Sequence, residues 1–373
     1  ARPEGGLSMS GETRGAKLKG LLLIAGFAGL SLALAASEVA RLLDGRARRA
    51  LETEVVEARR EASAALAAVI APQTLNAARG SVYLITVDGL PRGTAFVIDR
   101  ANGVLVTAAH TANSLPLGAG NVRVQIVNRG LRSPIRVRSA KLHAGFGAFR
   151  ELVEEYQPVR KGTSIYAPQV APIRDLAFDA ALLYVDPLDP ETGENRLGAN
   201  LPVASEDGLL ALGAGAAVAV IGYPYDTLDD GFIQDAATSR IERGVIAAMI
   251  APLDSARGEE DPEIANLITH RMATAGGNSG SPIINAAGEV IGIHTHGIES
   301  LSSNADSAAQ RADVIYDLLD PERERARLND IFLPAWRRTL SFWARGEDVL
   351  GWSFSLERQA PNREPKPLVG DID

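Results

Sequence analysis

The 373-residue sequence predicts an all-β core flanked by helical segments toward both ends of the chain. From Ala77 onward, short runs rich in β-branched residues alternate with Gly, Pro, Asn and Asp turns, which is typical of an antiparallel barrel or sandwich. The segments on either side instead have helical spacing of apolar residues or helix-favouring composition. The apolar content of 46% is ordinary for a globular protein and sufficient for a sizeable core.

The N-terminal part of the chain, residues 1–36, is predicted to be an export signal or a membrane anchor. Residues 20–36, GLLLIAGFAGLSLALAA, carry no charge and follow Arg14, Lys17 and Lys19. A basic segment before an apolar one is the pattern of an export signal, and about 17 apolar residues are also the lower limit for a spanning helix. We therefore expect an extracytoplasmic location: periplasmic, anchored in the inner membrane, or secreted. Membrane contact is expected only if the segment is not cleaved.

The rest of the chain divides into three predicted parts. Residues 37–73 are rich in Ala, Glu and Arg, and their apolar spacing favours an amphipathic helix or stalk that Pro72 ends. Residues 74–319 form the β-rich domain, and about residues 142–172 break its strand pattern and are interpreted as an insertion. Residues 320–373 are predicted to be a helical extension with a tail. The predicted strands are SVYLITV, TAFVID, GVLVTAAH, VRVQIV, AALLYV, AVAVIGYP, GVIAAMI, SPIIN and EVIGIH.

Charge and composition limit the possible function classes. The net charge of −8 argues against a nucleic-acid partner, and the absence of cysteine excludes a disulfide framework or a thiolate site. His294 and His296 lie two residues apart at the end of an apolar run, but beyond His270 no further ligand cluster accompanies them. We therefore expect no metal and no cofactor. A hydrogen-bonded core histidine remains an alternative for either member of the pair.

Three short stretches together hold the residue types of nucleophilic catalysis. GVLVTAAH ends a predicted strand in His110, FDAALLYV places Asp179 directly before an apolar run, and TAGGNSGSP sets Ser279 among glycines. A serine hydroxyl needs an adjacent base, an imidazole is such a base near neutral pH, and a carboxylate holds the imidazole in the right tautomer. Backbone N–H groups of a Gly-rich loop can stabilise the oxyanion. Asp175 is a weaker candidate because only Asp179 directly precedes the strand.

These stretches, with GTAFVI and GYPYD, resemble the trypsin/chymotrypsin-like serine peptidases over roughly residues 81–319. The resemblance implies two six-stranded antiparallel β-barrels, polypeptide substrates and no cofactor. It also implies that Ser279 is the nucleophile, His110 the base and Asp179 the orienting acid. The backbone N–H groups of Gly277 and Ser279 would then form the oxyanion hole.

Within this family, Asn278 and the absence of cysteine are similar to bacterial members, and GGNSGSP followed by GIH is similar to the glutamyl endopeptidases. That resemblance implies that His294 and Thr274 line the pocket for the residue before the scissile bond, where they could hydrogen-bond a Glu carboxylate. Ala273 stands where trypsin-type pockets carry Asp, which disfavours Arg or Lys in the pocket. The remaining substrate-binding residues implied are Thr295, His296 and Gly297.

Two other functions remain open at this stage. The first is an exported peptidase of the same family that prefers a small or apolar residue before the scissile bond. The second is a catalytically silent barrel that serves as a binding module.

Overall fold

The computed structural model describes the chain from Ile70 onward, with gaps. The predicted export or anchor segment and nearly all of the predicted stalk lie outside the described residues, as does most of the predicted insertion. None of the described helices is long and apolar enough to cross a membrane. The described residues are 70–148, 151, 159–160, 163–164, 177–225, 238–251, 261–298 and 306–344.

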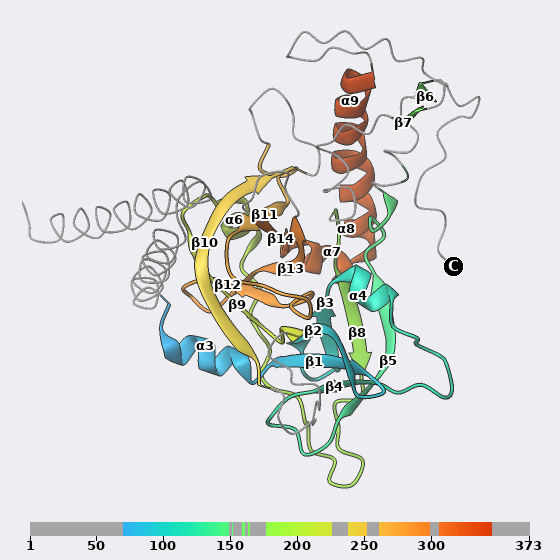
Figure 1. Cartoon of the computed structure of the whole chain (residues 1–373), viewed down its shortest axis with the longest axis vertical. Helices are drawn as coiled ribbons and strands as arrows, with labels where there is room; N and C mark the ends of the chain where they lie inside the picture. Colours follow the sequence, from blue (N-terminus) through green and yellow to red (C-terminus); the bar gives the residue numbers. More distant parts are fainter. Residues whose placement is uncertain are drawn as a thin grey trace, which may run out of the picture. The chain divides into compact units, whose positions relative to one another are not determined.

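The first six-stranded sheet closes on itself as an antiparallel barrel (Figure 1). Each strand pairs with the next in the order β1, β2, β3, β8, β5, β4, and β4 pairs back to β1. The strands are β1 (Val82–Val87), β2 (Leu90–Asp99), β3 (Val104–Thr107), β4 (Val124–Val127), β5 (Ile135–Leu142) and β8 (Ala181–Val185).

The second barrel has the same strand number and is also closed, in the order β10, β11, β14, β13, β12, β9. Its long strand β10 curves around one side of the barrel (yellow in Figure 1). The strands are β9 (Ala217–Gly222), β10 (Arg240–Ile250), β11 (Leu267–His270), β12 (Pro282–Ile284), β13 (Val290–Ile298) and β14 (Asp306–Arg311). The two closed barrels confirm the predicted fold class and settle the choice between barrel and sandwich.

Burial on both faces of β1 shows how the barrels share a core. Tyr83 and Ile85 belong to the apolar cluster that fills the first barrel. Val82 and Leu84 point to the other face, because side chains alternate along a strand, and belong to a larger cluster that includes strands of the second barrel. The Tyr223 hydroxyl, just after β9, also donates to the Val82 carbonyl (3.1 Å). The two barrels are therefore joined by packing and by hydrogen bonds.

Three barrel strands were not predicted: β5, β11 and β14. The β14 sequence DSAAQR shows no apolar pattern. Gln310 and Arg311 are nevertheless buried because they have partners outside the strand: Arg311 binds both carboxylate oxygens of Asp313, and Gln310 donates to the Asn266 carbonyl. Buried polar groups of this kind cannot be separated from a surface strand by sequence pattern.

Helices precede, connect and follow the barrel strands. Pro72, predicted only as the end of a preceding helix, is the first residue of α3 (Pro72–Arg79), where its missing N–H costs nothing. Short helices α4 (Ala109–Asn113) and α6 (Glu206–Leu210) lie between strands, and β6 (Val159–Arg160) pairs with β7 (Thr163–Ser164). The C-terminal helices are α7 (Asp313–Leu319), α8 (Pro321–Ala326), the π-helix η3 (Arg327–Phe332) and α9 (Leu333–Ala344).

Candidate active site

Strand pairing brings His110 and Asp179 together although 69 residues separate them in the chain. Thr107, the last residue of β3, pairs with Ala181, the first residue of β8. His110 therefore follows β3 at the same edge of the barrel at which Asp179 precedes β8. Helix α4 begins at Ala109, so His110 lies in its first turn at this edge.

Both carboxylate oxygens of Asp179 accept hydrogen bonds from His110. The backbone N–H donates to Oδ1 (2.8 Å), and Nδ1 lies 2.6 Å from Oδ2. The Asp179 side chain is 1% exposed, whereas the imidazole is 38% exposed. A carboxylate is an acceptor only, so it holds the hydrogen on Nδ1 and leaves the basic lone pair on Nε2. Burial lowers the pKa of His110, but the hydrogen bond and charge of Asp179 together raise it more, to above the ordinary 6.5.

Ser279 lies in the loop between β11 and β12, in a backbone conformation that depends on two glycines. Gly277 and Gly280 have φ of +99° and +87°. A Cβ at Gly277 would lie 2.3 Å from the Tyr223 carbonyl oxygen, and one at Gly280 would lie 2.1 Å from that of Thr94. Glycine is therefore required on both sides of Ser279 for two reasons, the left-handed φ and the close backbone approach.

The Ser279 loop is hydrogen-bonded to the first barrel through Thr94 of β2. The Thr94 N–H donates to the Ser279 carbonyl (2.8 Å), and its hydroxyl donates to the Gly277 carbonyl (2.8 Å). The Thr94 carbonyl in turn accepts from the Thr107 hydroxyl (2.7 Å), three residues before His110. A Cβ at Gly93 would lie 2.7 Å from the Thr111 side chain and 3.0 Å from the Ser279 carbonyl. The Ser279 loop and the strand that leads to His110 are thus both hydrogen-bonded to Thr94, where the two barrels join.

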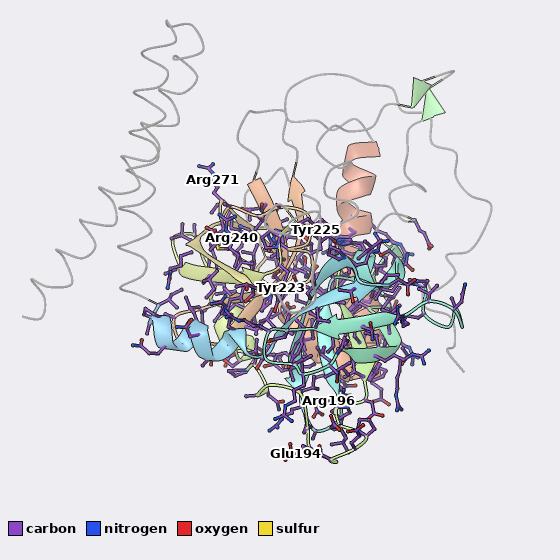
Figure 2. All side chains as sticks on the ribbon, turned by 60° about the horizontal axis from the view of Figure 1, so that its bottom comes forward. Glu194, Arg196, Tyr223, Tyr225, Arg240 and Arg271 are labelled. Carbon is purple, nitrogen blue, oxygen red and sulfur yellow. The ribbon has the colours of Figure 1, made fainter. Side chains whose placement is uncertain are left out.

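The peptide group before Gly277 has a fixed orientation. The Tyr225 N–H donates to the Gly276 carbonyl (2.7 Å), and a trans peptide directs the Gly277 N–H the opposite way. Tyr223 and Tyr225 lie on the segment after β9 (labelled in Figure 2), and the Tyr225 ring lies against Gly277. Among the described residues, neither the Gly277 N–H nor the Ser279 N–H donates to a protein acceptor. These two N–H groups, one of the serine itself and one of the residue two before it, are donors of the kind that an oxyanion site requires.

The Ser279 hydroxyl itself donates to the Thr295 backbone carbonyl (3.0 Å). Thr295 lies at a bulge of β13, where the pairing with β14 shifts between His294 and His296. Its own hydroxyl is buried and donates to the Ala308 carbonyl (3.1 Å). The Ser279 hydroxyl must rotate away from the Thr295 carbonyl before a base can accept its proton.

His294 and Thr274, predicted to line the substrate pocket, have different partners. The Thr274 hydroxyl is 2.8 Å from that of Ser307 on β14. His294 is 3% exposed and its Nδ1 lies 3.2 Å from Nε2 of His270, which is fully buried. The Met272 N–H donates to His270 Nδ1 (3.3 Å), so a neutral His270 carries its hydrogen on Nε2 and donates it to His294. A neutral His294 then carries its own hydrogen on Nε2.

The other predicted pocket residues are less informative. Ala273 is exposed, and the structure describes only the backbone of His296 and Gly297, both in β13. In the described part of the chain, no three His, Cys, Asp or Glu residues are grouped as a metal site would require.

Four residues that contribute to this geometry were not predicted: Thr94, Tyr225, His270 and Phe178. Thr94 and Tyr225 lie in the quoted stretches GTAFVI and GYPYD, but only hydrogen bonds reveal their contacts with the serine loop. The sequence suggests His270 only as a possible metal ligand. No sequence signal distinguishes Phe178 from an ordinary core residue.

The chain is similar to a protein-family model and to solved structures. Residues 93–293, more than half of the chain, match the family model of the trypsin-like peptidase domain. No curated protein matches the chain. Among solved structures, an inactive serine-to-alanine mutant of Rv3671c from M. tuberculosis is 20% identical over 68% of this chain and 92% of that one, with a TM-score of 0.39. The inactive form of the Rv3671c protease is 21% identical over 68% and 94%, with a TM-score of 0.40.

Proposed function

Because the chain belongs to the trypsin-like peptidase family, we propose that it is a serine endopeptidase that uses Ser279, His110 and Asp179. One observation carries the proposal: both Asp179 oxygens bind His110, and Gly280 of the serine loop lies against Ala108, two residues before His110. The family match supports hydrolysis of polypeptides, and the hydrogen bonds support the assignment of roles to individual residues.

In the proposed mechanism, Ser279 Oγ attacks the scissile carbonyl while His110 Nε2 accepts its proton. Asp179 stabilises the imidazolium that forms, and the N–H groups of Gly277 and Ser279 stabilise the negative carbonyl oxygen. His110 then gives the proton to the leaving amine, which leaves an acyl-enzyme on Ser279. Water, activated by His110, attacks the acyl group and releases the acid, which restores the hydroxyl.

We also propose a preference for Glu before the scissile bond. The tautomer chain from Met272 through His270 directs a donor hydrogen to His294 Nε2, and a carboxylate accepts such a hydrogen strongly in a shielded site. The Thr274 hydroxyl would be the second donor. Cleavage of a proteome-derived peptide mixture tests this preference. A Glu preference that survives His294→Ala contradicts the role given to His294, and cleavage after small or apolar residues favours the alternative specificity.

A proposal for the location of the protein rests on residues 20–36, which lie outside the described residues. We propose that this segment exports the chain or anchors it in the membrane, with the peptidase domain outside the cytoplasm. Sequencing the N-terminus of the mature protein distinguishes a cleaved signal from an anchor. A mature protein in the cytoplasm would contradict both.

Labelling with an organophosphonate tests the peptidase assignment itself. The reagent should form an adduct on Ser279 of the folded protein and none on Ser279→Ala. Ser281→Ala is the matched control, because it removes a nearby buried hydroxyl that has no hydrogen-bond partner among the described residues. Absence of labelling in folded wild-type protein would contradict the assignment and favour a silent binding module.

A further inference from the structure

Phe178, the residue directly before Asp179, has an unusual backbone conformation. Its φ is +56°, and apart from Asp88 it is the only described non-glycine residue with a positive φ. A bulky residue adopts this conformation only where its surroundings hold it, because the side chain crowds the backbone. Phe178 is 1% exposed. The conformation of this residue sets the direction in which the next residue, Asp179, projects its carboxylate.

Both backbone polar groups of Phe178 are hydrogen-bonded, one of them to a residue of the second barrel. The Phe178 N–H donates to Gln310 Oε1 of β14 (2.8 Å). Gln310 is fully buried, and its Nε2 donates to the Asn266 carbonyl (2.9 Å), which fixes the amide orientation. The Phe178 carbonyl accepts from the Ala180 N–H (2.8 Å). Both peptide groups that flank Phe178 therefore have defined partners.

Three aromatic rings contact the Phe178 ring. One face stacks on His143 of the loop after β5, with ring centroids 4.5 Å apart and planes 9° apart. Phe332 of η3 and Trp336 of α9 meet the ring edge-on, at 4.7 Å and 5.6 Å. A Cβ at Gly145 would lie 2.5 Å from the ring, so this loop also packs on it without a gap.

The C-terminal helical segment, residues 313–336, is fastened to the loop that carries His143. The Glu324 carboxylate accepts the Ala144 N–H (2.8 Å) and lies 3.2 Å from Lys141 Nζ. Asp317, which has no exposed side-chain surface, binds Arg327 (2.6 Å) and Arg323 (2.7 Å). Burial raises the pKa of Asp317, but His143 and the two arginines lower it more, so the pKa lies below its ordinary 3.8. These ion pairs and hydrogen bonds hold in place the helical segment that carries Phe332 and Trp336.

We propose that Phe178 is a positioning residue and that the C-terminal helical segment is the clamp that holds it, so that Asp179 meets His110. The proposal rests on the proposed function. It gives the C-terminal helices a role beyond packing: they transmit the position of η3 and α9 to the orienting carboxylate through a single aromatic ring. Without the clamp, Phe178 relaxes to a negative φ and the carboxylate turns away from His110 Nδ1.

The first test reads the His110–Asp179 hydrogen bond without substrate. A short N–H···O bond to a carboxylate gives a strongly downfield proton signal, which we expect from His110 Nδ1–H in the wild-type protein. The signal should disappear or move upfield in Phe178→Ala and Trp336→Ala and return in Trp336→Phe. Leu328→Ala is the control, because it removes a buried side chain from η3 and leaves the aromatic cluster intact. An unchanged signal in folded Phe178→Ala overturns the proposal.

The second test is kinetic. Trp336→Ala and Phe178→Ala should lower kcat by about 10- to 100-fold with little change in KM, as expected for a misplaced catalytic group. In an Asp179→Asn background, the same substitutions should change kcat less than about twofold, because the carboxylate that they position is gone. Losses that multiply in that background overturn the proposal. A normal downfield signal in a protein that hydrolyses no peptide would instead contradict the proposed function and leave the clamp supported.

Discussion

Asp179→Asn is the substitution whose effect the structure defines most closely. His110 presents two donors to Asp179, the backbone N–H at 2.8 Å and Nδ1 at 2.6 Å, and each meets a separate carboxylate oxygen. An asparagine amide has one acceptor oxygen and one donor NH₂ group, so it can satisfy only one of them. If the oxygen binds the backbone N–H, the NH₂ group donates to Nδ1 and forces the hydrogen onto Nε2. The imidazole then cannot accept the Ser279 proton.

The expected loss in kcat is about 10⁴-fold, the size reported for the same change in the chymotrypsin-type triad. At about 1.36 kcal/mol for each tenfold change, this corresponds to about 5.4 kcal/mol of lost transition-state stabilisation. The assay is steady-state hydrolysis of a peptide substrate, with circular dichroism to show that the variant is folded. Asp175→Asn is the matched control, because Asp175 is the other acid that the sequence offers next to the strand. A folded Asp179→Asn enzyme within tenfold of wild-type kcat would refute the reasoning.

Three further predictions concern pH, the oxyanion site and stability. The value of kcat/KM should rise with pH through a midpoint above 6.5 as His110 loses its proton. In Asp179→Asn the midpoint should fall. Equal midpoints for the two proteins in a pH–rate profile would contradict this prediction. Gly277→Ala, whose Cβ would meet a carbonyl oxygen at 2.3 Å, should lower kcat by about 10²- to 10³-fold, whereas Gly213→Ala, in open space, should not. Asp317→Asn should lower the free energy of unfolding by about 1–3 kcal/mol at pH 7 in urea titrations, because it removes one of the two carboxylate partners of Arg323 and of Arg327. Since the folded-state pKa of Asp317 is depressed, its contribution is present above pH 3.8 and is lost as the pH falls further, so the difference should shrink in acid.

The fold could be predicted because most of the buried barrel strands are apolar runs that can be recognised in the sequence. Runs such as SVYLITV and AALLYV are apolar and lie between turn residues, and both became barrel strands. The strand DSAAQR could not be recognised, because its buried residues are polar and depend on Asn266 and Asp313, which belong to other elements. A sequence pattern identifies the apolar residues of a core, but it does not identify buried polar residues that are hydrogen-bonded to other elements.

The same limit applies to the candidate site. His110, Asp179 and Ser279 stand beside strand ends and glycines that the sequence shows directly. The residues that hold them have no such sequence signal. Thr94 acts through its backbone and hydroxyl, and Phe178 acts through a backbone angle. Such roles depend on which segments meet in three dimensions, and local residue types carry no information about them.

The hydrogen bonds of Thr94 also bear on how the protein is made. Ser279 and Gly277 belong to the second barrel, yet their carbonyls are bound by a residue of the first. The loop that holds the serine can therefore reach its geometry only after the two barrels have docked. Synthesis delivers the first barrel before the second, so an unfinished chain would hold the proposed acid and base without the proposed nucleophile. If these residues act as proposed, the peptidase would be inactive until the two barrels have docked.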